Sequence, residues 1–457
     1  MAKAVRDLRS WLERLAESGR LSETKPGLAL RYEIAAVSKA TENTRAMIFP
    51  QPEGHSIPVV SNILAERQWM ADALGIASSE LLPRFQDAVR NPLKTVEVAS
   101  GPAQEVVHRD VDLMKQMPIP THNELDSGPY ISAGVLFARN PETGAQNLSI
   151  HRCQISAPNK IGILLLPRHT LAFANKAAAK NGALEVAIAI GLDPATLLAS
   201  QAIVPLDFDE LEIAGALHGK PVDVVKCVTN EVRVPANAEI VIEGRIIPDE
   251  REPEGPFGEF PQYYGPRIDS HVLHVDAITH RRNPVFHTIV GGSTEHLLLG
   301  GIAREATILD HLQRAFPDVK DVHLARGGVC RYHLVVQMHK RSEGIAKNVI
   351  MGAFAAHYDI KQVIVVDMDV NIHDPIEVQW AVATRFQGDR DLVVVTGAQG
   401  SKLDPSARSG VSTKMGFDAT VPLDADPSHF IRIRVPGQEE VKVDELKVCK
   451  SLSGIVG

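Results

Sequence analysis

The chain has 457 residues, of which 44% are hydrophobic and 23% charged, and its formal net charge is -8. This composition is ordinary for a folded globular protein of about three domains, and it excludes a largely disordered chain. The negative balance argues against sequence-independent binding of nucleic acid, which needs a basic surface, so we expect a small-molecule partner and no nucleic acid.

The first expected domain covers residues 1–115 and is a small α/β unit. Its amino terminus predicts an amphipathic helix, because apolar residues recur there at helical spacing. The apolar run 57–61 predicts a strand, and helices are expected around 69–74 and 81–89. A shift in composition near 107–120 marks the end of this domain. The apolar residues of the first helix are Leu8, Trp11, Leu12 and Leu15.

The second expected domain covers residues 116–300 and is rich in strand signals. Residues 271–279 alternate apolar and polar side chains, as half-buried antiparallel strands do. A barrel-like antiparallel sheet is therefore predicted, interrupted by short helices at 171–181, 194–200 and 210–217. The strands are expected at 131–138, 147–155, 161–166, 185–190, 222–228, 239–246 and 272–278.

A linker helix is expected within residues 301–318, over Ile302–Phe316, followed by a third domain at 319–457. Apolar runs in that domain alternate with helical patterns, which is typical of an α/β domain. The fold class predicted for the whole chain is therefore α+β and multidomain. The strands of the third domain are expected at 322–324, 332–337, 362–366 and 391–395, and its helices at 343–356 and 375–384.

Cysteine usage and hydropathy favour a cytoplasmic protein. The chain has no C-x-x-C pair, which argues against a disulfide framework and against a thiolate zinc site. It has neither the apolar segment of a signal peptide nor the roughly 20 apolar residues of a membrane span, so we expect no membrane partner. The four cysteines are Cys153, Cys227, Cys330 and Cys449.

The segment Glu254-Gly-Pro-Phe-Gly-Glu259 places two carboxylates five residues apart across a turn. Gly255, Pro256 and Gly258 favour that turn without help from the side chains. If the surroundings push the two pKa values apart, one carboxyl can hold a proton while the other stays charged, as acid–base catalysis requires. A solvated acidic turn is the alternative that spacing alone leaves open.

Three further polar residues offer a mixed ligand set. Asn147, His169 and Glu210 supply an amide oxygen, an imidazole and a carboxylate, which suit Mn²⁺ or Mg²⁺ better than structural zinc. Each also has a plainer explanation: local pairing in a strand, a surface position after proline, or a first-turn acid of a helix. The sequence motifs of P-loop, dinucleotide-binding, zincin and serine-hydrolase sites are absent.

Taken in order, dispersed motifs of the chain resemble the UbiD family of reversible decarboxylases, over nearly its whole length. The resemblance implies prenylated FMN held in a split β-barrel of the flavin reductase-like type, with Mn²⁺ and K⁺ at the cofactor phosphate. It also implies a separate flavin prenyltransferase that supplies the cofactor, and a homodimer or hexamer built through the third domain. The motifs are Asn147–Gln154, Pro167-Arg-His169, Glu210-x-x-x-Ala-Gly215, Lys226-Cys227 and Glu254–Glu259.

The resemblance also assigns roles by position. Asn147, His169 and Glu210 would be the Mn²⁺ ligands, and Arg152, Glu254 and Glu259 the catalytic set, with Glu259 as the proton donor. His151 and Arg168 depart from the common pattern, which has Tyr and Gln there, so the detailed flavin contacts do not transfer directly. A surface position remains the alternative for Lys414. The implied cofactor-binding residues are Ser149, Ile150, His151, Arg152, Arg168, His169 and Lys414.

The segment 291–300 is similar to one that borders the substrate pocket in this family, and His296 and Arg304 are unusual there. Because both can bind a second carboxylate, the chain resembles the furan-2,5-dicarboxylate branch and is predicted to form 2-furoate and CO₂. A helix cap by His296 and a salt bridge of Arg304 are the alternatives. At the level of function, an aromatic, pyrrole or acrylic monoacid as substrate, a non-catalytic flavin-binding or assembly protein, and a metal-dependent hydrolase also stay open.

Overall fold

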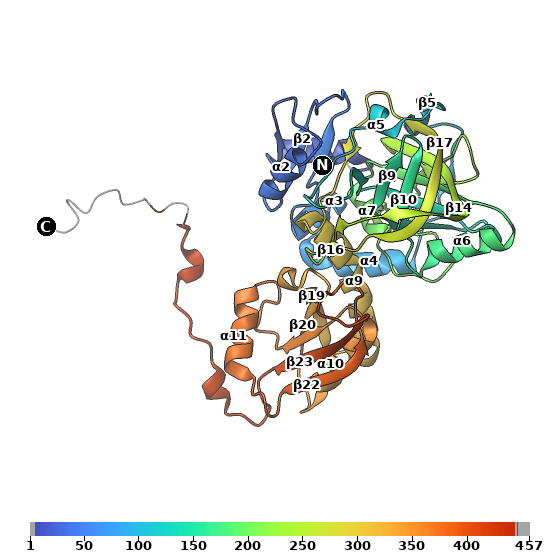
Figure 1. Ribbon diagram of the computed structural model, residues 1–457. Coiled ribbons are helices and arrows are strands. Elements are labelled where there is room, and N and C mark those ends of the chain that lie inside the picture. Colours follow the sequence, from blue (N-terminus) through green and yellow to red (C-terminus); the bar gives the residue numbers. More distant parts are fainter. Residues whose placement is uncertain (1–4, 444–445, 447–457) are drawn as a thin grey trace.

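The computed structural model describes residues 5–443 and 446, and shows several mixed helix-and-strand regions (Figure 1). The predicted α+β, multidomain fold class is confirmed. The expected first and third domains extend to residues 1–4, 444–445 and 447–457, and these, with Cys449, lie outside the described residues. Across the described part of the chain, none of the helices is both long and apolar enough to cross a membrane.

The amino-terminal region is built on a small sheet with the strand order β1-β2-β3-β18. The first predicted helix is confirmed as α1 (Leu8–Glu17), and its four apolar residues are buried. Strand β18 (Phe286–His287) comes from much later in the chain and pairs in parallel with β3. The other elements are β1 (Leu21–Glu23), α2 (Glu33–Thr41), β2 (Ala46–Phe49), β3 (Val59–Ser61), α3 (Arg67–Leu74) and α4 (Leu81–Arg90).

The central region is a sheet of nine strands within the described residues, mainly antiparallel, with the path β6-β9-β10-β17-β14-β11-β7-β8 and β5 paired to β17. Residues 132–134 join β6 to β7 and residues 151–152 join β8 to β9, so short connections link the two ends of the path. The sheet must therefore curve until its ends meet, as in a split barrel. Its strands are β5 (Val106–His108), β6 (Tyr130–Ile131), β7 (Val135–Arg139), β8 (Gln146–Ile150), β9 (Cys153–Ala157), β10 (Lys160–Ile163), β11 (Leu184–Ile190), β14 (Ile240–Glu254) and β17 (Ile268–His280).

Two predicted strands of this region are each interrupted, and a third, predicted at 239–246, continues to Glu254. Residues 131–138 and 147–155 each form two strands with a break, at 132–134 and at 151–152. The breaks lie where the ends of the sheet meet, so His151 and Arg152 stand at the seam of the barrel. The helices of the region are α6 (His169–Ala179), α7 (Pro194–Ala199) and α8 (Leu211–His218), and a small sheet of β4 (Val96–Glu97), β12 (Asp223–Lys226) and β13 (Arg233–Pro235) adjoins it.

A long helix, α9 (Thr294–Ala315), joins the barrel to the third region. Its predicted start at Ile302 is wrong, because the helix begins at Thr294, with Ser293 accepting a hydrogen bond from the His296 amide as the amino-terminal cap. The helix packs against α4, α7 and the helix α10 (Ile345–Ala356). It therefore lies at the junction of all three regions (Figure 1).

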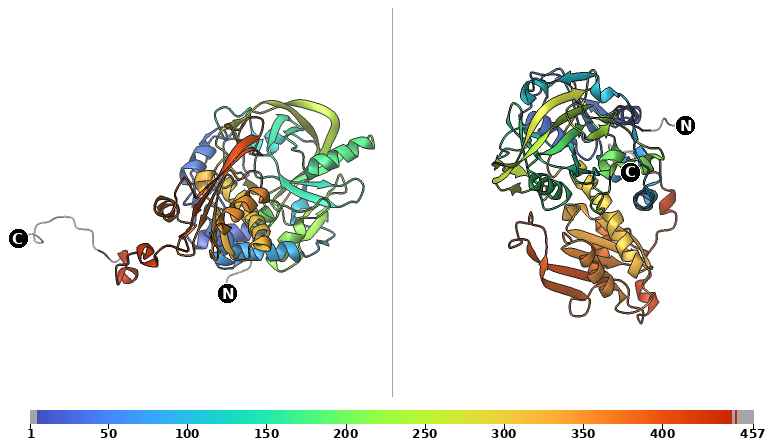
Figure 2. Two further views of the ribbon diagram at one scale, coloured as in Figure 1. Left: turned by 90° about the horizontal axis from the view of Figure 1, so that it is seen from below. Right: turned by 90° about the vertical axis from the view of Figure 1, so that its right-hand side faces the viewer.

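The third region has a five-stranded sheet within the described residues, with the order β19-β20-β21-β23-β22. Helices alternate with its strands, as predicted. Beyond β23 the chain forms the short turns η4 (Pro427–Phe430) and η5 (Gln438–Glu440) and runs away from the rest of the molecule (Figures 1 and 2). The elements are β19 (Val319–Leu324), β20 (His333–Met338), β21 (Gln362–Val366), α11 (Pro375–Arg385), β22 (Leu392–Gln399) and β23 (Val411–Ala419).

Candidate active site

One arginine at the seam of the barrel holds both carboxylates of the glycine–proline turn. Arg152 Nη2 lies 2.6 Å from Glu254 Oε2, and its Nη1 lies 2.6 Å from Glu259 Oε1. The side chains are 7%, 1% and 14% exposed for Arg152, Glu254 and Glu259. The alternative of a solvated acidic turn is therefore wrong, because a buried, charge-assisted triad forms instead.

The turn has its shape because glycine leaves room for the arginine. Gly255 has φ 89°, and a Cβ there would stand 2.8 Å from the Pro266 carbonyl oxygen. A Cβ on Gly265 would stand 2.7 Å from Arg152 Nη1. Strands β15 (Phe257–Gly258) and β16 (Tyr264–Gly265) pair across the turn and fix it. A side chain at Gly265 would therefore push the guanidinium group away, whereas one at Gly255 would clash with the Pro266 carbonyl oxygen and strain the left-handed backbone of the turn.

The proton affinity of Glu259 suits a proton donor. Burial raises its pKa above the ordinary value, although the Arg152 charge acts in the opposite direction. A carboxyl group whose pKa is raised by burial holds its proton nearer to neutral pH, as a general acid must. We therefore expect the donor form of Glu259 to be lost as the pH rises through that raised pKa.

The three expected metal ligands converge on one point. One atom of the Asn147 side-chain amide lies 2.8 Å from His169 Nδ1 and 3.1 Å from Glu210 Oε1. Burial raises the pKa of Glu210 to about 8, so in the absence of a cation this carboxyl favours its neutral form. No cluster of three His, Cys, Asp or Glu side chains with metal-binding geometry occurs in the described residues, and here an amide completes the set. Such a donor set fits a divalent ion.

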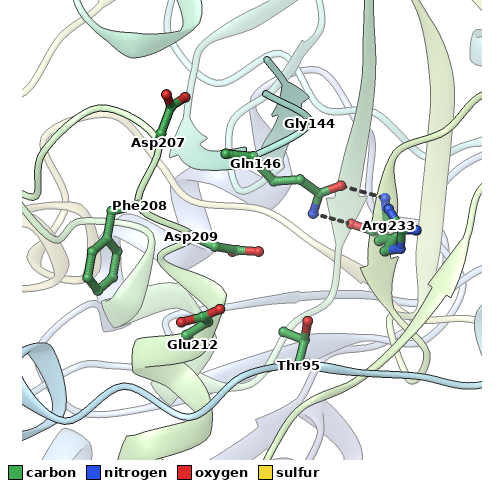
Figure 3. Close-up of a pocket in the computed structure, with 9 residues that line it drawn as sticks. Thr95, Gly144, Gln146, Asp207, Phe208, Asp209, Glu212 and Arg233 are labelled. Atoms are coloured by element: carbon green, nitrogen blue, oxygen red, sulfur yellow. Dashed lines mark hydrogen bonds between the residues drawn. The ribbon is translucent and has the colours of Figure 1, made fainter. Parts of the chain in front are cut away.

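A cavity of about 360 Å³ is lined by sequence neighbours of Asn147 and Glu210 (Figure 3). None of the three expected metal ligands lines it. The Gln146 side chain donates to the Arg233 carbonyl oxygen at 3.0 Å and accepts from its amide at 2.7 Å. Because successive side chains of a strand point to opposite faces, Gln146 is directed to β13 and Asn147 to the other face. The cavity is lined by Thr95, Gly144, Ala145, Gln146, Asp207, Phe208, Asp209, Glu212 and Arg233.

The predicted cofactor residues on β8 and beyond it form a polar cluster next to the metal set. The Ser149 hydroxyl lies 2.9 Å from His151 Nε2 and 3.3 Å from the Thr170 hydroxyl. His151 Nδ1 lies 3.1 Å from the Leu164 carbonyl oxygen. A carbonyl oxygen can only accept a hydrogen bond, so Nδ1 carries the proton of the ring. Burial lowers the pKa of His151 to about 4, so this imidazole is neutral. Ile150, between them, is only partly buried.

Two arginines meet next to the Glu254–Glu259 turn. A Cβ on Gly300 would stand 1.8 Å from Arg331 Nη2 and 3.0 Å from Arg304 Nη1, so glycine there lets the Arg331 guanidinium group pack against helix α9, beside that of Arg304 on the same helix. Arg331 lies over the Phe260 ring, at 5.4 Å from its centroid. Burial, and then the Arg304 charge, lower the pKa of Arg331 to about 9. Burial also lowers the pKa of Arg304.

Neither guanidinium group forms an ion pair with a carboxylate of the described chain. Arg304 donates to the Gly300 carbonyl oxygen at 2.6 Å, and Arg331 donates to the carbonyl oxygens of Leu297 and Cys330. The alternative of a salt bridge for Arg304 is therefore wrong. The buried carboxylate of Asp359 acts on both charges but forms an ion pair with neither, so the two neighbouring cations still repel each other, and an anionic ligand would relieve that repulsion.

His296 belongs to the same cluster. Its Nδ1 accepts a hydrogen bond from the Gly292 amide at 3.1 Å, so its remaining proton is on Nε2. Burial, and then Arg331 and Arg304, lower the pKa of His296 to about 3. The N-cap residue of α9 is Ser293, and His296 supports the same helix start by accepting the Gly292 amide, so the capping alternative is borne out in part. A neutral imidazole that donates from Nε2 is suited to an anion.

Lys414 is buried, and the surface alternative for it is wrong. The side chain is on β23, 3% of the residue is exposed, and Nζ donates to the Tyr358 carbonyl oxygen at 2.8 Å. Arg168 Nη2, from the barrel, donates to the Tyr358 hydroxyl at 3.0 Å. Tyr358 therefore connects Arg168 and Lys414, two of the predicted cofactor-binding residues, although they come from different regions of the chain.

Sequence reasoning missed several residues of this site. Tyr130 donates a hydrogen bond to Glu254, and the Arg331 guanidinium group lies beside that of Arg304. His357 lies close enough to several arginines and Lys414 to feel their charges. Burial, followed by the charges of Arg304, Arg168, Arg331 and Lys414, lowers the pKa of His357 to about 3. No motif or spacing marks these residues in the sequence. The only local signal was Gly300, since a glycine within a helix often allows close approach of a neighbour.

The chain matches three family domains in succession. Residues 12–89 match the 3-octaprenyl-4-hydroxybenzoate carboxy-lyase N-terminal domain, residues 94–294 its Rift-related domain, and residues 297–419 its C-terminal domain. The three matches together span most of the chain. They carry the family designation UbiD.

Individual relatives are similar over nearly the whole length. HmfF from Pelotomaculum thermopropionicum, solved in complex with FMN, is 48% identical, with a TM-score of 0.94 over 96% of this chain and 100% of that one. An evolved dimeric form of HmfF holds prFMN, with 45% identity and a TM-score of 0.90 over 96% and 99% of the chains. The anhydromevalonate phosphate decarboxylase of Methanothermobacter thermautotrophicus is 37% identical over 93% of this chain and 99% of its own. The gallate decarboxylase of Lactiplantibacillus plantarum is 34% identical over 85% and 86%.

Proposed function

The chain belongs to the UbiD family of carboxy-lyases, and we propose that it interconverts furan-2,5-dicarboxylate with 2-furoate and CO₂. The observation that carries this proposal is the pair of buried guanidinium groups, Arg304 and Arg331, next to the triad of Arg152, Glu254 and Glu259. A diacid has one carboxylate to lose and one to bind. The triad suits the first and the arginine pair the second.

The residues present fit prenylated FMN and its ions. Asn147, His169 and Glu210 would hold Mn²⁺, with K⁺ at the same phosphate, and the cations Arg168 and Lys414 would balance the phosphate charge. When bound, prenylated FMN supplies the electron sink that loss of CO₂ from an sp² carbon requires and that no side chain offers. The structures of HmfF with FMN and with prFMN support the flavin part of this proposal.

The chain's own groups then bind the substrate and move one proton. Arg304, Arg331 and the Nε2 of His296 hold the retained carboxylate. Arg152 keeps Glu254 ionised by charge-assisted hydrogen bonds. Glu259 delivers its proton to the ring carbon that has lost CO₂, and in the reverse direction it removes that proton. Glu259 is the more exposed of the two carboxylates, at 14% against 1% for Glu254, so it can take up a new proton from solvent after each turnover.

A direct test is reconstitution with prenylated FMN, Mn²⁺ and K⁺, supplied by co-production with a flavin prenyltransferase. We expect the absorbance of furan-2,5-dicarboxylate to decline while 2-furoate and CO₂ appear in equal amounts, and the reverse reaction at high CO₂. Failure of the loaded protein to turn over any aryl, heteroaryl or acrylic acid would reject the decarboxylase. A protein that keeps the flavin without turnover would instead support the binding or assembly alternative.

A second candidate substrate is an acid that carries a phosphate. The anhydromevalonate phosphate decarboxylase among the relatives acts on a molecule with a phosphate group, by its name. The pair of Arg304 and Arg331 would accept a phosphate as well as a carboxylate, because a guanidinium fork matches both. Comparing the two substrates at equal concentration distinguishes the candidates, and a monoacid that outperforms both would reject the need for a second anion.

We also propose a cytoplasmic homo-oligomer formed through the third region. The carboxyl-terminal arm, residues 431–443, shows the period-two pattern of a strand: Ile431, Ile433 and Val435 are 75%, 98% and 66% exposed, and arginines alternate with them. The root of the arm is fixed, because Arg432 lies 4.4 Å from the Trp380 ring centroid. Such a stretch can extend up to roughly 40 Å, far enough to reach a second copy.

Aspartate at both Ile433 and Val435 should therefore weaken the assembly. Burying a charge in place of an apolar residue at an interface is strongly unfavourable, so we expect the mass from light scattering to fall toward the 49.7 kDa of one chain. Leu206→Asp, at an exposed leucine of the barrel region, is the control and should keep the wild-type mass. A wild-type protein that is monomeric, or a double variant of unchanged mass, would contradict this proposal.

A further inference from the structure

The two carboxylates of the triad receive unequal numbers of hydrogen bonds. Glu254 Oε2 accepts from Arg152 Nη2 at 2.6 Å and Nε at 3.2 Å, and its Oε1 accepts from the Tyr130 hydroxyl at 3.0 Å. Glu259 accepts one side-chain hydrogen bond, from Arg152 Nη1 at 2.6 Å. The difference between the two sites is therefore made partly by Arg152 and partly by Tyr130.

The Tyr130 hydroxyl has one hydrogen and two acceptors within reach. The Gln154 side-chain oxygen also lies 3.0 Å away, but it already accepts a hydrogen bond from the Gly255 amide at 2.9 Å. A carboxylate is a stronger acceptor than an amide oxygen in a dry site. The hydrogen of Tyr130 therefore goes to Glu254. Tyr130 itself is 0% exposed, so no water competes for this hydrogen.

Tyr130 is held in place by the segment that leads to it. Asp126 Oδ1 accepts from the Gly258 amide at 2.8 Å, and Ser127 donates from its hydroxyl to the Gly255 carbonyl oxygen. The Tyr130 ring lies 4.4 Å from that of Phe257, centroid to centroid. The segment 126–130 therefore contacts the turn through two hydrogen bonds and one ring contact. These contacts fix the position of the Tyr130 hydroxyl relative to Glu254.

We propose that Tyr130 is a positioning residue that keeps Glu254 the ionised member of the triad and leaves the transferable proton to Glu259. The inference rests on the proposed decarboxylation for its catalytic consequence, but the hydrogen bond itself does not. A carboxylate that accepts three hydrogen bonds, two of them from a guanidinium group, is stabilised in its charged form. With Glu254 ionised, the shared arginine is partly neutralised, and burial can then keep Glu259 protonated.

The first test is the variant Tyr130→Phe, which removes one oxygen atom and keeps the ring. The kcat for decarboxylation should fall about 10- to 100-fold, the range for losing a hydrogen bond to a charged group, while KM stays near the wild-type value. The acid limb of the pH–rate profile should move to higher pH, because activity needs ionised Glu254. The groups that face Glu254 are Arg152, Glu259, Tyr130 and the Cys153 thiol, and none of the other three is altered.

A second readout uses the flavin-free protein. Tyr130→Phe should lower Tm relative to wild type by an amount that is largest near neutral pH and shrinks as the pH falls, because protonation of Glu254 weakens the bond in the wild type. Tyr264→Phe is the matched control, since its hydroxyl accepts only from the Leu125 amide at 3.2 Å. That control should show a gap in Tm that does not change with pH, and an unshifted acid limb.

The two readouts separate failure of the inference from failure of the proposed function. An unshifted acid limb together with a Tm gap that is independent of pH would overturn the role of Tyr130. If wild type turns over no acid, the decarboxylation is rejected, and the pH dependence of the Tm gap still decides the hydrogen bond. A loss of kcat that is equal at every pH would also count against the proposal, because it would indicate a structural role alone.

Discussion

Replacing Glu259 with glutamine should abolish decarboxylation, with a loss of about 10²- to 10⁴-fold, the range for removing a general acid. The glutamine oxygen can still accept the hydrogen bond from Arg152 Nη1, so the geometry of the triad is kept. The amide, however, has no proton to give. Turnover is measured by chromatography of 2-furoate, and exchange of the ring hydrogen with deuterium by NMR, and both should be lost together.

The cofactor should stay bound in Glu259→Gln, so its visible absorption band is the internal control. Glu124→Gln is the matched variant, because Glu124 is exposed and belongs to the segment that borders the same turn. It should keep wild-type turnover.

In the wild type, burial raises the pKa of Glu259, so the rate should fall on the alkaline side as the donor form is lost. Retained exchange in Glu259→Gln would transfer the donor role to another group.

The sequence was sufficient for the acidic turn and for the polar set around Asn147. Both consist of residues whose types and spacing carry chemical information on their own, and local patterns predict the turn of Glu254 and Glu259 as well as the strand and helix starts near the polar set. The structure brings Asn147, His169 and Glu210 to one point and buries Glu254 and Glu259 around Arg152. Their roles as metal ligands and as acid and base remain proposals.

The sequence could not show which distant segments of the chain lie side by side in the fold. Arg331 and His357 come from turns of the third region, and only the packing of that region on helix α9 brings them to the barrel. The early start of α9 was missed for the same reason. Glycines are poor helix formers, so Gly300 and Gly301 favoured a later start, whereas close packing of Cys330 and Arg331 requires them.

The break between β8 and β9 was also missed. Residues 147–155 were predicted as one continuous strand, although the alternation of apolar residues changes phase at His151 and Arg152. The curvature of the barrel forces the interruption, since the ends of the sheet meet there. That interruption turns Arg152 toward Glu254 and Glu259. The functional position of Arg152 is therefore a product of the curved sheet and not of the local strand pattern.

Replacing Arg331 with methionine should lower kcat/KM for furan-2,5-dicarboxylate by about 10²-fold or more, because truncating one member of a buried charge contact usually costs about 2–5 kcal/mol. Arg304→Met and His296→Asn should act in the same direction. Exchange of the ring hydrogen of 2-furoate, which lacks the second carboxylate, should change far less. The ratio of the two activities is the measurement, since a general loss of stability would lower both.

Two further variants make this test specific. Gly300→Ala leaves every charge in place but puts a methyl group 1.8 Å from the present position of Arg331 Nη2, so the guanidinium group must move and the selectivity should fall as in Arg331→Met. Arg326→Met is the control, because Arg326 is exposed and donates to Asn43 and to the Thr294 hydroxyl, away from the cluster. Equal losses for the diacid and for 2-furoate would contradict the assignment of Arg304 and Arg331 to the second carboxylate. A wild-type preference for a phosphorylated acid, lost in Arg331→Met, would keep the anion site and replace the furan diacid as its ligand.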